Sequence, residues 1–169
     1  SLKNIELCIQ LTQNGNTNTT STSVFYDSYQ GEESGVFMDC TSLETVTIHL
    51  KVSVTTGVYT YANTFRNCTS LKKIEVPEGV TAIPSYAFNG CSNLEEVVLP
   101  GTLTSIGAYA FYGCSSLEKI WIDQSVSSIG SSAFANCSVL TIHGIEGSYA
   151  ETYATSNNIP FSTEIMVYP

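Results

Sequence analysis

The stretch AFNGCSNLEEVVLP, residues 87–100, recurs along the chain at a fixed distance. Twenty-three residues earlier the chain reads TFRNCTSLKKIEVP (64–77), and 23 residues later it reads AFYGCSSLEKIWID (110–123). A constant period between about 20 and 50 residues is typical of a solenoid, in which each repeat buries its apolar side only against its neighbours. The same step relates the phenylalanines at the start of the motif: Phe65, Phe88, Phe111 and Phe134.

Within each repeat the apolar residues predict two short strands. The segment 94–99 reads L-x-x-V-x-L and ends in the alternation of a strand with one buried side. Pro100 follows directly and lacks a hydrogen-bond donor, so the strand ends there. A second apolar pair, Leu103 and Ile106, predicts a return strand on the opposite wall. A helix-like turn then leads to the next phenylalanine, whose ring we expect in the interior.

The residue before each repeated cysteine predicts a sharp corner. Asparagine and glycine tolerate the left-handed backbone conformation better than other residues. They occupy this position in all four copies, as Asn67, Gly90, Gly113 and Asn136. We therefore expect a positive φ at each of these corners.

The regular repeats cover residues 64–146, and the segments before them match less closely. FMDCTSLETVTI (37–48) and SLKNIEL (1–7) carry parts of the motif, but out of phase with it. Residues 1–63 are therefore expected to form irregular rungs, with an insertion at about 8–36.

The end of the chain predicts a cap. Ser148 and Glu151 form the S-x-x-E pattern of a capping box, which opens a helix. A helix over the last rung would cover an edge that could otherwise aggregate. Residues 147–169 are expected to hold this cap and a tail. In the tail Ile165 and Val167 alternate, which leaves two alternatives: one more strand or a frayed end. The whole chain, 1–169, then forms one domain of about six rungs.

The charge and the hydrophobicity of the chain argue against two classes of partner, nucleic acids and membranes. The net charge is −9 and the pI about 4.4, and the few basic residues are scattered. Without a basic patch to neutralise phosphates, nucleic acid is not an expected partner. No apolar run reaches the ~20 residues of a membrane span, so membrane insertion is not expected. A charged share of only 12% is common in extracellular β-rich proteins.

Five of the six cysteines are expected to form a column of buried free thiols rather than a metal site or a disulfide framework, whereas Cys8 has no partner in the column and its state is left open. Metal ligands come as close C-x₂-C pairs with partners, and this chain has none. Stacked side chains would point in parallel, with Cβ atoms farther apart than the ~3.8 Å that a disulfide needs. We therefore expect no disulfide and no metal among Cys40, Cys68, Cys91, Cys114 and Cys137.

No group of residues predicts catalysis. A catalytic histidine needs a nucleophile and an orienting acid nearby, and neither His49 nor His143 has them in a recognisable pattern. Glu95 and Glu96 are adjacent, but neighbours in a strand face opposite sides. We expect no enzyme activity and no cofactor.

The repeated motif AFxGCxSLxxIxIPxxVxxIGxxAF resembles the BspA-type leucine-rich repeat. The match is tight over residues 64–161 and looser over 37–63, and the ending GSYAETYATSNNIPF resembles the cap of such arrays. The resemblance implies a right-handed leucine-rich-repeat solenoid, mainly β with short helical turns. It also implies a bacterial surface-exposed or secreted protein that acts as an adhesin or binding module, often as part of a longer chain.

Two columns of side chains are expected on the outer face of the strands. One holds Lys73, Glu96 and Lys119, which predict a surface charge ladder. The other holds Glu6, Thr47, Glu75, Val98, Trp121 and His143. Val98 and Trp121 are apolar where solvent is expected, and tryptophan is enriched at binding hot spots. The alternative is that Trp121 is covered by the insertion, by the C-terminal tail or by a second copy of the chain.

These observations favour a non-enzymatic extracellular module that binds a protein or a glycan through the parallel-sheet face. The residues expected to carry binding are Trp121, Val98, Lys119, Glu96, Lys73 and Glu75. The alternative function is a structural spacer or a weakly self-associating element of a larger cell-surface protein.

Overall fold

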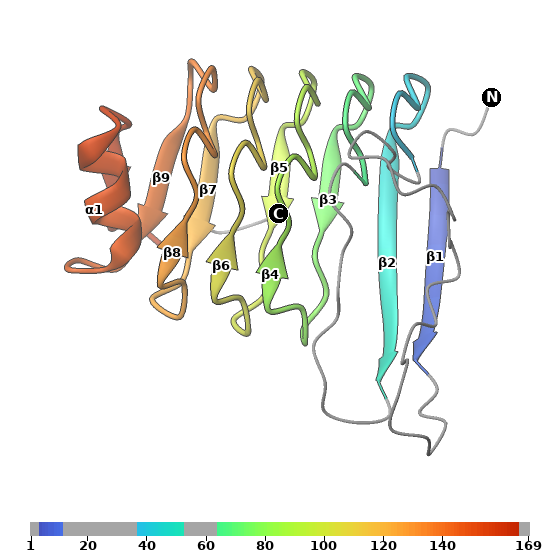
Figure 1. The fold of residues 1–169 in the computed structure, drawn as a ribbon, viewed down its shortest axis with the longest axis horizontal. Coiled ribbons are helices and arrows are strands. Elements are labelled where there is room, and N and C mark those ends of the chain that lie inside the picture. The colour runs from blue at the N-terminus through green and yellow to red at the C-terminus, as the bar shows by residue number, and fades with distance from the viewer. Residues whose placement is uncertain (1–3, 12–36, 53–63, 166–169) are drawn as a thin grey trace.

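The computed structural model describes residues 4–11, 37–52 and 64–165 of the 169-residue chain. In this part of the chain, short strands line two sides of a solenoid, and the rungs follow one another from β1 at one end to the single helix α1 at the other (Figure 1). The predicted leucine-rich-repeat solenoid is confirmed, with about four regular turns at the 23-residue spacing.

One side of the solenoid carries parallel strands in two adjoining sheets. The first has the order β1-β2-β3-β5 and joins β1 (Asn4–Leu11), β2 (Thr45–Val52), β3 (Lys73–Glu75) and β5 (Glu96–Val98). The second has the order β10-β9-β7 and joins β7 (Lys119–Ile122), β9 (Thr141–Gly144) and β10 (Phe161–Ser162). Figure 1 shows β5 and β7 side by side, so the two sheets form one face although the ladder is interrupted between them.

Proline decides where the regular strands end. β3 stops at Glu75 and β5 stops at Val98, in each case two residues before a proline. In the next rung Asp123 stands at the proline position, and β7 continues to Ile122. The missing amide donor therefore sets strand length in this array.

The opposite wall is a sheet of two-residue strands. It has the order β4-β6-β8 and joins β4 (Ala82–Ile83), β6 (Ser105–Ile106) and β8 (Ser128–Ile129). Each ends in a buried isoleucine, as predicted for the return strand. In β6 and β8 the next residue is a glycine, and its amide bonds to the isoleucine carbonyl of the preceding rung at 2.8 Å.

Those glycines allow the rungs to approach closely. A Cβ on Gly107 would lie 2.4 Å from the amide nitrogen of Ser85, and a Cβ on Gly130 would lie 2.3 Å from that of Ala108. Real Cβ atoms do not come so near to backbone atoms. The isoleucine–glycine pair in the motif is therefore required by the spacing between rungs.

Phenylalanine rings fill the core, as predicted, and the structure shows that they form a continuous stack. From Phe37 through Phe65, Phe88, Phe111 and Phe134, neighbouring ring centroids lie 5.1 to 5.5 Å apart and the ring planes are within 13° of parallel. Rings that are this close and parallel add to the area they bury. The stack ties each rung to the next.

The predicted corners are confirmed, and the turns contain a second unusual residue. Positive φ values occur before each repeated cysteine, at Asn67 (59°), Gly90 (76°), Gly113 (74°) and Asn136 (63°). The turns that lead to the phenylalanines also contain residues with positive φ, which the sequence did not indicate: Tyr86, Tyr109 and Ser132.

The cap is confirmed. Helix α1 (Tyr149–Ser156) begins at the N-cap Ser148, whose hydroxyl accepts a hydrogen bond from the Glu151 amide at 3.4 Å. The Glu151 carboxylate accepts from the Gly147 amide at 2.7 Å, one residue earlier than in the usual capping box. Three buried residues, Ala150, Tyr153 and Ala154, form the side of the helix that covers the last rung.

Two expectations concern the ends of the array. The insertion was expected from about residue 8, whereas β1 continues to Leu11, and most of the insertion lies outside the described residues. The tail adds β10 beside β9, but Ile165 lies beyond that strand and is 84% exposed. Val167 lies outside the described residues.

Candidate functional site

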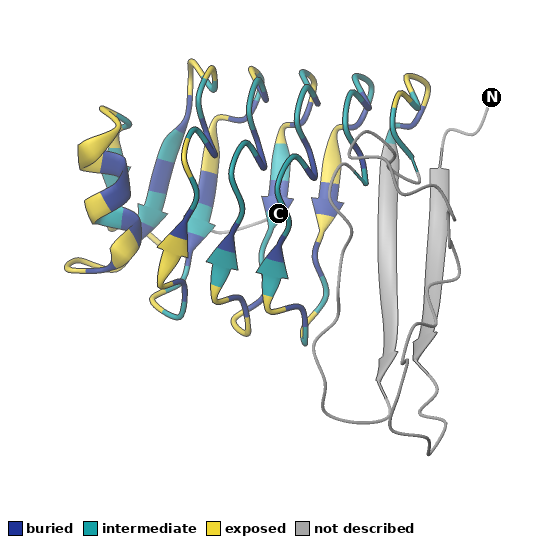
Figure 2. Ribbon diagram, in the orientation of Figure 1, coloured by how far each residue is buried: buried dark blue, intermediate teal, exposed yellow. Residues whose placement is uncertain are grey.

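The outer face of the sheet is built by simple alternation along each strand. In β7, Ile120 and Ile122 are buried in the core, whereas Lys119 is exposed and Trp121 is half-buried. Because successive side chains in a strand point to opposite sides, Lys119 and Trp121 share the outer face. The same pattern is visible along the neighbouring strands in Figure 2.

The strand register brings the predicted residues into two columns. Lys73 pairs with Glu96 in register, and Glu75 pairs with Val98. Trp121 pairs with His143, and Lys119 pairs with Thr141. The predicted positions of Glu6 and Thr47 also follow the register, since Glu6 pairs with Thr47 and Thr47 with Glu75. The six candidate binding residues therefore come from three neighbouring strands, β3, β5 and β7.

The charged column differs from the expected ladder. Lys73 Nζ lies 2.7 Å from Glu96 Oε1, which forms the first expected pair. In the described part of the chain no ion pair joins Lys119 to Glu96 or to any other carboxylate. The prediction of a three-residue ladder is therefore wrong at its second step: Glu96 has Lys73 as its partner, and Lys119 has no ion-pair partner among the described residues.

Trp121 presents a partly exposed aromatic surface. Among the described residues no other ring and no cation stacks on its indole, and its indole N–H donates to none of them. Beside it, Val98 of β5 is also partly exposed. The two residues form a small apolar patch in the middle of the face.

The tail reaches this face at one point. His143, the register partner of Trp121, has its Nδ1 atom 3.1 Å from the backbone carbonyl oxygen of Glu164. The described tail therefore contacts the neighbour of Trp121 rather than stacking on the indole itself. Any cover supplied by residues 12–36 or 166–169 lies outside the described part of the chain.

The cysteine column forms rung-to-rung hydrogen bonds. Each of four thiols donates to the carbonyl of the phenylalanine one rung earlier, at 2.9 Å for Cys68 to Phe37 and 3.0 Å for Cys91 to Phe65. The other two bonds, from Cys114 and Cys137, repeat the arrangement at 3.3 and 3.1 Å. These four cysteines and Cys40 are free thiols.

Burial makes these thiols poor nucleophiles. Loss of solvation raises the pKa of Cys68 to about 12 and that of Cys137 to about 11. The same cause raises the pKa of Cys91 and Cys114 further above the ordinary value. Since the thiolate is the reactive form, the column is structural rather than catalytic.

A column of tyrosine rings, which was not predicted from the sequence, lies along the turns that precede the phenylalanines. The rings of Tyr86 and Tyr109 stack at 5.0 Å, and the guanidinium of Arg66 lies 5.8 Å from the Tyr86 ring. Tyr109 also meets Tyr112 at 5.8 Å with tilted rings. The 23-residue spacing of Tyr86 and Tyr109 was the available signal. Because these rings cover one another, the column stabilises the turns and offers little open aromatic surface.

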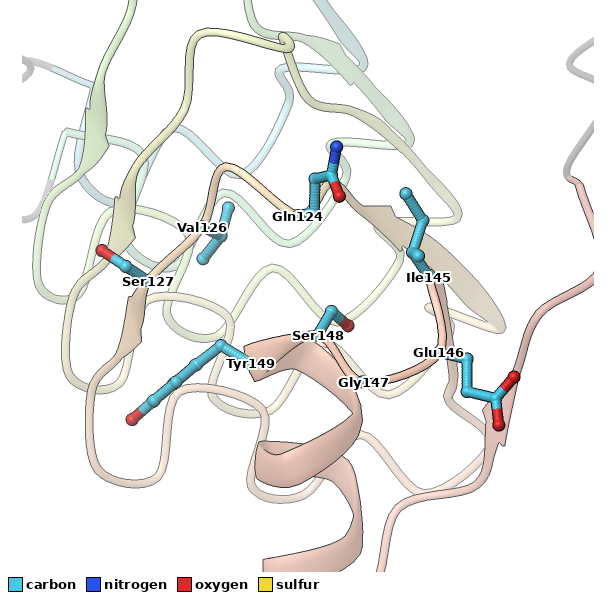
Figure 3. Close-up of a pocket in the computed structure, with 8 residues that line it drawn as sticks. All are labelled: Gln124, Val126, Ser127, Ile145, Glu146, Gly147, Ser148 and Tyr149. Carbon is cyan, nitrogen blue, oxygen red and sulfur yellow. The ribbon is translucent and has the colours of Figure 1, made fainter.

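A surface hollow of about 390 Å³ lies where the cap meets the last rungs (Figure 3). Ile145 and Tyr149, which are 40% and 42% exposed, supply the exposed part of its apolar lining. Glu146 is its one carboxylate, and it contains no histidine or cysteine. The remaining lining residues are Gln124, Val126, Ser127, Gly147 and Ser148. The hollow therefore lacks a nucleophile–base pair or a set of metal ligands.

The described residues contain neither a cluster of metal-binding side chains nor a membrane-spanning helix. No group of three or more histidine, cysteine, aspartate or glutamate side chains there could hold a metal ion. No helix in the described part is long and apolar enough to cross a membrane.

Comparison with known proteins agrees with this fold. A family model, the BspA type leucine rich repeat region, matches residues 58–158 in six copies. The T. pallidum leucine rich repeat protein TpLRR is similar in structure, with a TM-score of 0.55 and 32% identity over 63% of this chain and 48% of that chain. A leucine-rich repeat protein from Bacteroides ovatus ATCC 8483 has a TM-score of 0.52 and 29% identity over 66% of this chain and 28% of that chain.

The structural matches cover only part of each related protein. The chain spans about half the length of the T. pallidum protein and less than a third of the B. ovatus protein. No curated protein matches the chain. The family match covers more than half of the 169 residues and coincides with the regular rungs. The chain belongs to the BspA-type leucine-rich repeat family.

Proposed function

We propose that this chain is a non-enzymatic binding module of a bacterial surface or secreted protein, with a role in adhesion. In this proposal it recognises a protein or a glycan through the outer face of its parallel sheet. Trp121 carries the proposal, because its indole is partly exposed and no described residue stacks on it. Exposed apolar residues beside polar ones are typical of contact surfaces, and tryptophan is the residue most enriched among binding hot spots.

Family membership supports the broad class of function. Repeats of this family form extended surfaces on which each rung contributes side chains at fixed spacing, and such arrays serve as binding or structural modules. The low charged share of 12% and the absence of a membrane-spanning helix among the described residues are compatible with a surface or secreted protein. The site itself, rather than the fold, must identify the ligand.

The lack of a recognisable catalytic group among the described residues supports the proposed non-enzymatic role. The thiols of Cys68, Cys91 and Cys114 are buried, which raises the pKa of each. His143 is bonded to a backbone carbonyl rather than to an acid. The hollow beside the cap contains a single carboxylate. Activity on a broad panel of substrates that a single substitution abolishes would contradict this part of the proposal.

A binding screen tests the proposal. The purified chain is applied to extracellular-matrix proteins and glycans in parallel with Trp121→Glu, which places a charge in the middle of the patch. Val139→Glu is the matched control, because Val139 is an exposed apolar residue outside the strands of the face. The proposal predicts a ligand that is lost with Trp121→Glu and kept with Val139→Glu. A ligand kept by both variants would place the binding surface elsewhere.

Self-association is the second candidate, since the Trp121–Val98 patch could pack against the same patch of a second copy around a twofold axis. Light scattering over a concentration series separates the two functions. A dimer that Trp121→Glu dissociates would favour a self-associating spacer. A monomer at all concentrations would favour recognition of a different partner.

A further inference from the structure

Lys119 is the sole lysine or arginine in the chain after Lys73, although the same stretch contains nine acidic residues. It lies two residues before the single tryptophan of the chain and shares its face of the sheet. Its ammonium group has no ion-pair partner among the described residues. This position differs from the rest of the array because a cation without an ion-pair partner in the described part of the chain lies beside a partly exposed indole, in a protein of net charge −9.

The outer positions of the neighbouring strand β9 contain no carboxylate, whereas on the β5 side the carboxylate of Glu96 is paired with Lys73. Thr141 lies opposite Lys119 in the register, and His143 lies opposite Trp121. The Thr141 hydroxyl and the indole N–H of Trp121 have no hydrogen-bond partner among the described residues. Glu118 and Glu164 are the acidic residues next in sequence to this part of the face, and neither forms an ion pair with Lys119. The half of the face formed by β7 and β9 therefore presents a cation, an aromatic plane and unpaired hydrogen-bonding groups.

The other half of the face has the opposite character. In β3 and β5 the outer charges are Lys73, Glu75 and Glu96, and Lys73 is already bonded to Glu96. Among the described residues, the charge on that half that has no ion-pair partner is therefore the carboxylate of Glu75. An anionic ligand would be repelled there and attracted to Lys119, which fixes the end of the face where it would bind.

We propose that Lys119, Trp121 and Thr141 form a subsite for a sugar ring that carries a carboxylate, as at the end of an acidic glycan. This inference rests on the proposed function and specifies its ligand. The apolar side of the ring would pack on the indole, and its carboxylate would pair with the Lys119 ammonium. The ring hydroxyls would bond to the Thr141 hydroxyl and the indole N–H. Every group in the subsite then has a chemical partner.

The size of the patch favours a sugar over a folded protein. Neighbouring strands lie about 4.8 Å apart, so the patch on β7 and β9 is about as wide as one sugar ring. A stable protein interface instead needs about 800 Å² on each partner. An acidic peptide shares the charge of the proposed ligand and is therefore included in the test.

The single tryptophan makes the test specific, because any change in tryptophan fluorescence comes from Trp121. The probes are an oligosaccharide that ends in glucuronate and its counterpart that ends in glucose, which differ by one carboxylate. We expect a saturable fluorescence change, with at least about tenfold tighter binding of the glucuronate probe, since a charge-assisted bond is lost with the neutral one. Added salt should reduce this preference.

Variants assign the preference to Lys119. We expect Lys119→Met to remove the preference for the glucuronate probe and Lys119→Arg to retain most of it. Lys72→Met is the matched control, because Lys72 is an exposed lysine that precedes β3 and lies outside the proposed subsite. It removes the same charge from the chain and should leave the preference unchanged.

The outcomes separate this inference from the proposed function. Equal binding of the two probes, an unchanged preference in Lys119→Met, or no fluorescence change with either probe would overturn the acidic-sugar subsite. A glutamate-rich peptide that binds in a Lys119-dependent manner while the sugars do not would overturn it in favour of a peptide ligand. In each case the proposed function would still hold if Trp121→Glu abolished binding of the ligand found in the screen.

Discussion

The ring of Tyr153 in the cap helix meets the ring of Phe134 edge-on, with centroids 6.0 Å apart and planes at 70°. Phe134 is the last member of the phenylalanine stack, whose other neighbours are parallel. Tyr153 thus ends the stack by changing its geometry. A further parallel ring would extend the array, whereas an edge-on ring from a helix closes it.

Tyr153→Ala should destabilise the chain by about 3 kcal/mol, because it removes a large side chain that is only 7% exposed. It also uncovers the end of the core, so aggregation should increase. Tyr149→Ala in the same helix is the control, since that ring is 42% exposed and should change stability by less than about 1 kcal/mol. Urea unfolding and light scattering measure both effects. Equal costs for the two variants would refute a capping role for Tyr153.

Gly130→Ala should be among the most damaging single-methyl additions in the array. The new Cβ would lie 2.3 Å from the Ala108 amide nitrogen, and a backbone atom cannot move aside as a flexible side chain does. We expect a loss of about 1 to 3 kcal/mol, the usual cost of overpacking. Gly101→Ala is the matched change, because nothing lies within 4 Å of its Cβ position. If the two variants unfold at the same urea concentration, the close approach between rungs is not required.

The corner at Asn136 should accept glycine and reject a branched residue. Its φ of 63° is the left-handed conformation that Gly90 and Gly113 adopt at the same place in other rungs. Asn136→Gly should change the free energy of unfolding by less than about 0.5 kcal/mol, whereas Asn136→Val should cost about 1 to 2 kcal/mol. Chemical denaturation of both variants compares the two costs. A neutral Asn136→Val would mean that the corner tolerates ordinary backbone geometry.

The thiol column predicts a specific loss of stability at alkaline pH. Folding raises the pKa of Cys137 to about 11 from an ordinary value of 9.0, so above pH 9.0 the folded state keeps a proton that the unfolded state loses. The stability from this thiol is complete below pH 9.0 and is lost as the pH rises toward the folded pKa. Each such thiol should lower the free energy of unfolding by up to about 1.4 kcal/mol per pH unit in this range.

Cys137→Ala isolates this effect from the titration of tyrosines, which both proteins share. The slope of unfolding free energy against pH between 9.5 and 10.5 should be shallower in the variant by about 1 kcal/mol per pH unit. Identical slopes in the two proteins would show that Cys137 does not keep its proton in the folded state.

The features that repeat in the sequence were predictable, because one physical constraint acts at every rung. The phenylalanine stack and the corners before the cysteines each follow from a residue type that recurs every 23 residues. The strand ends at Glu75 and Val98 follow from the prolines behind them. The helix cap followed from the Ser148–Glu151 pattern, although the carboxylate bonds to Gly147.

The features that depend on contacts between rungs, rather than on a local residue pattern, were not predictable. The register placed Lys73, Glu96 and Lys119 in line, but sequence spacing cannot show which lysine Glu96 selects. The positive φ at Tyr86 and Tyr109 could not be predicted from the sequence either, because tyrosine rarely adopts that conformation. The hollow beside the cap depends on how the helix meets the last rungs, and no local pattern encodes this arrangement.

The most direct measurement of the central claim is a map of backbone amide shifts when a ligand from the screen is added to ¹⁵N-labelled protein. Recognition through the sheet face predicts shifts concentrated in β5, β7 and β9, together with the indole N–H signal of Trp121. It also predicts that residues around the hollow, such as Ile145 and Tyr149, stay unchanged. Shifts that cluster at the hollow or along the Tyr86–Tyr109 edge, with the indole signal unmoved, would contradict binding through this face.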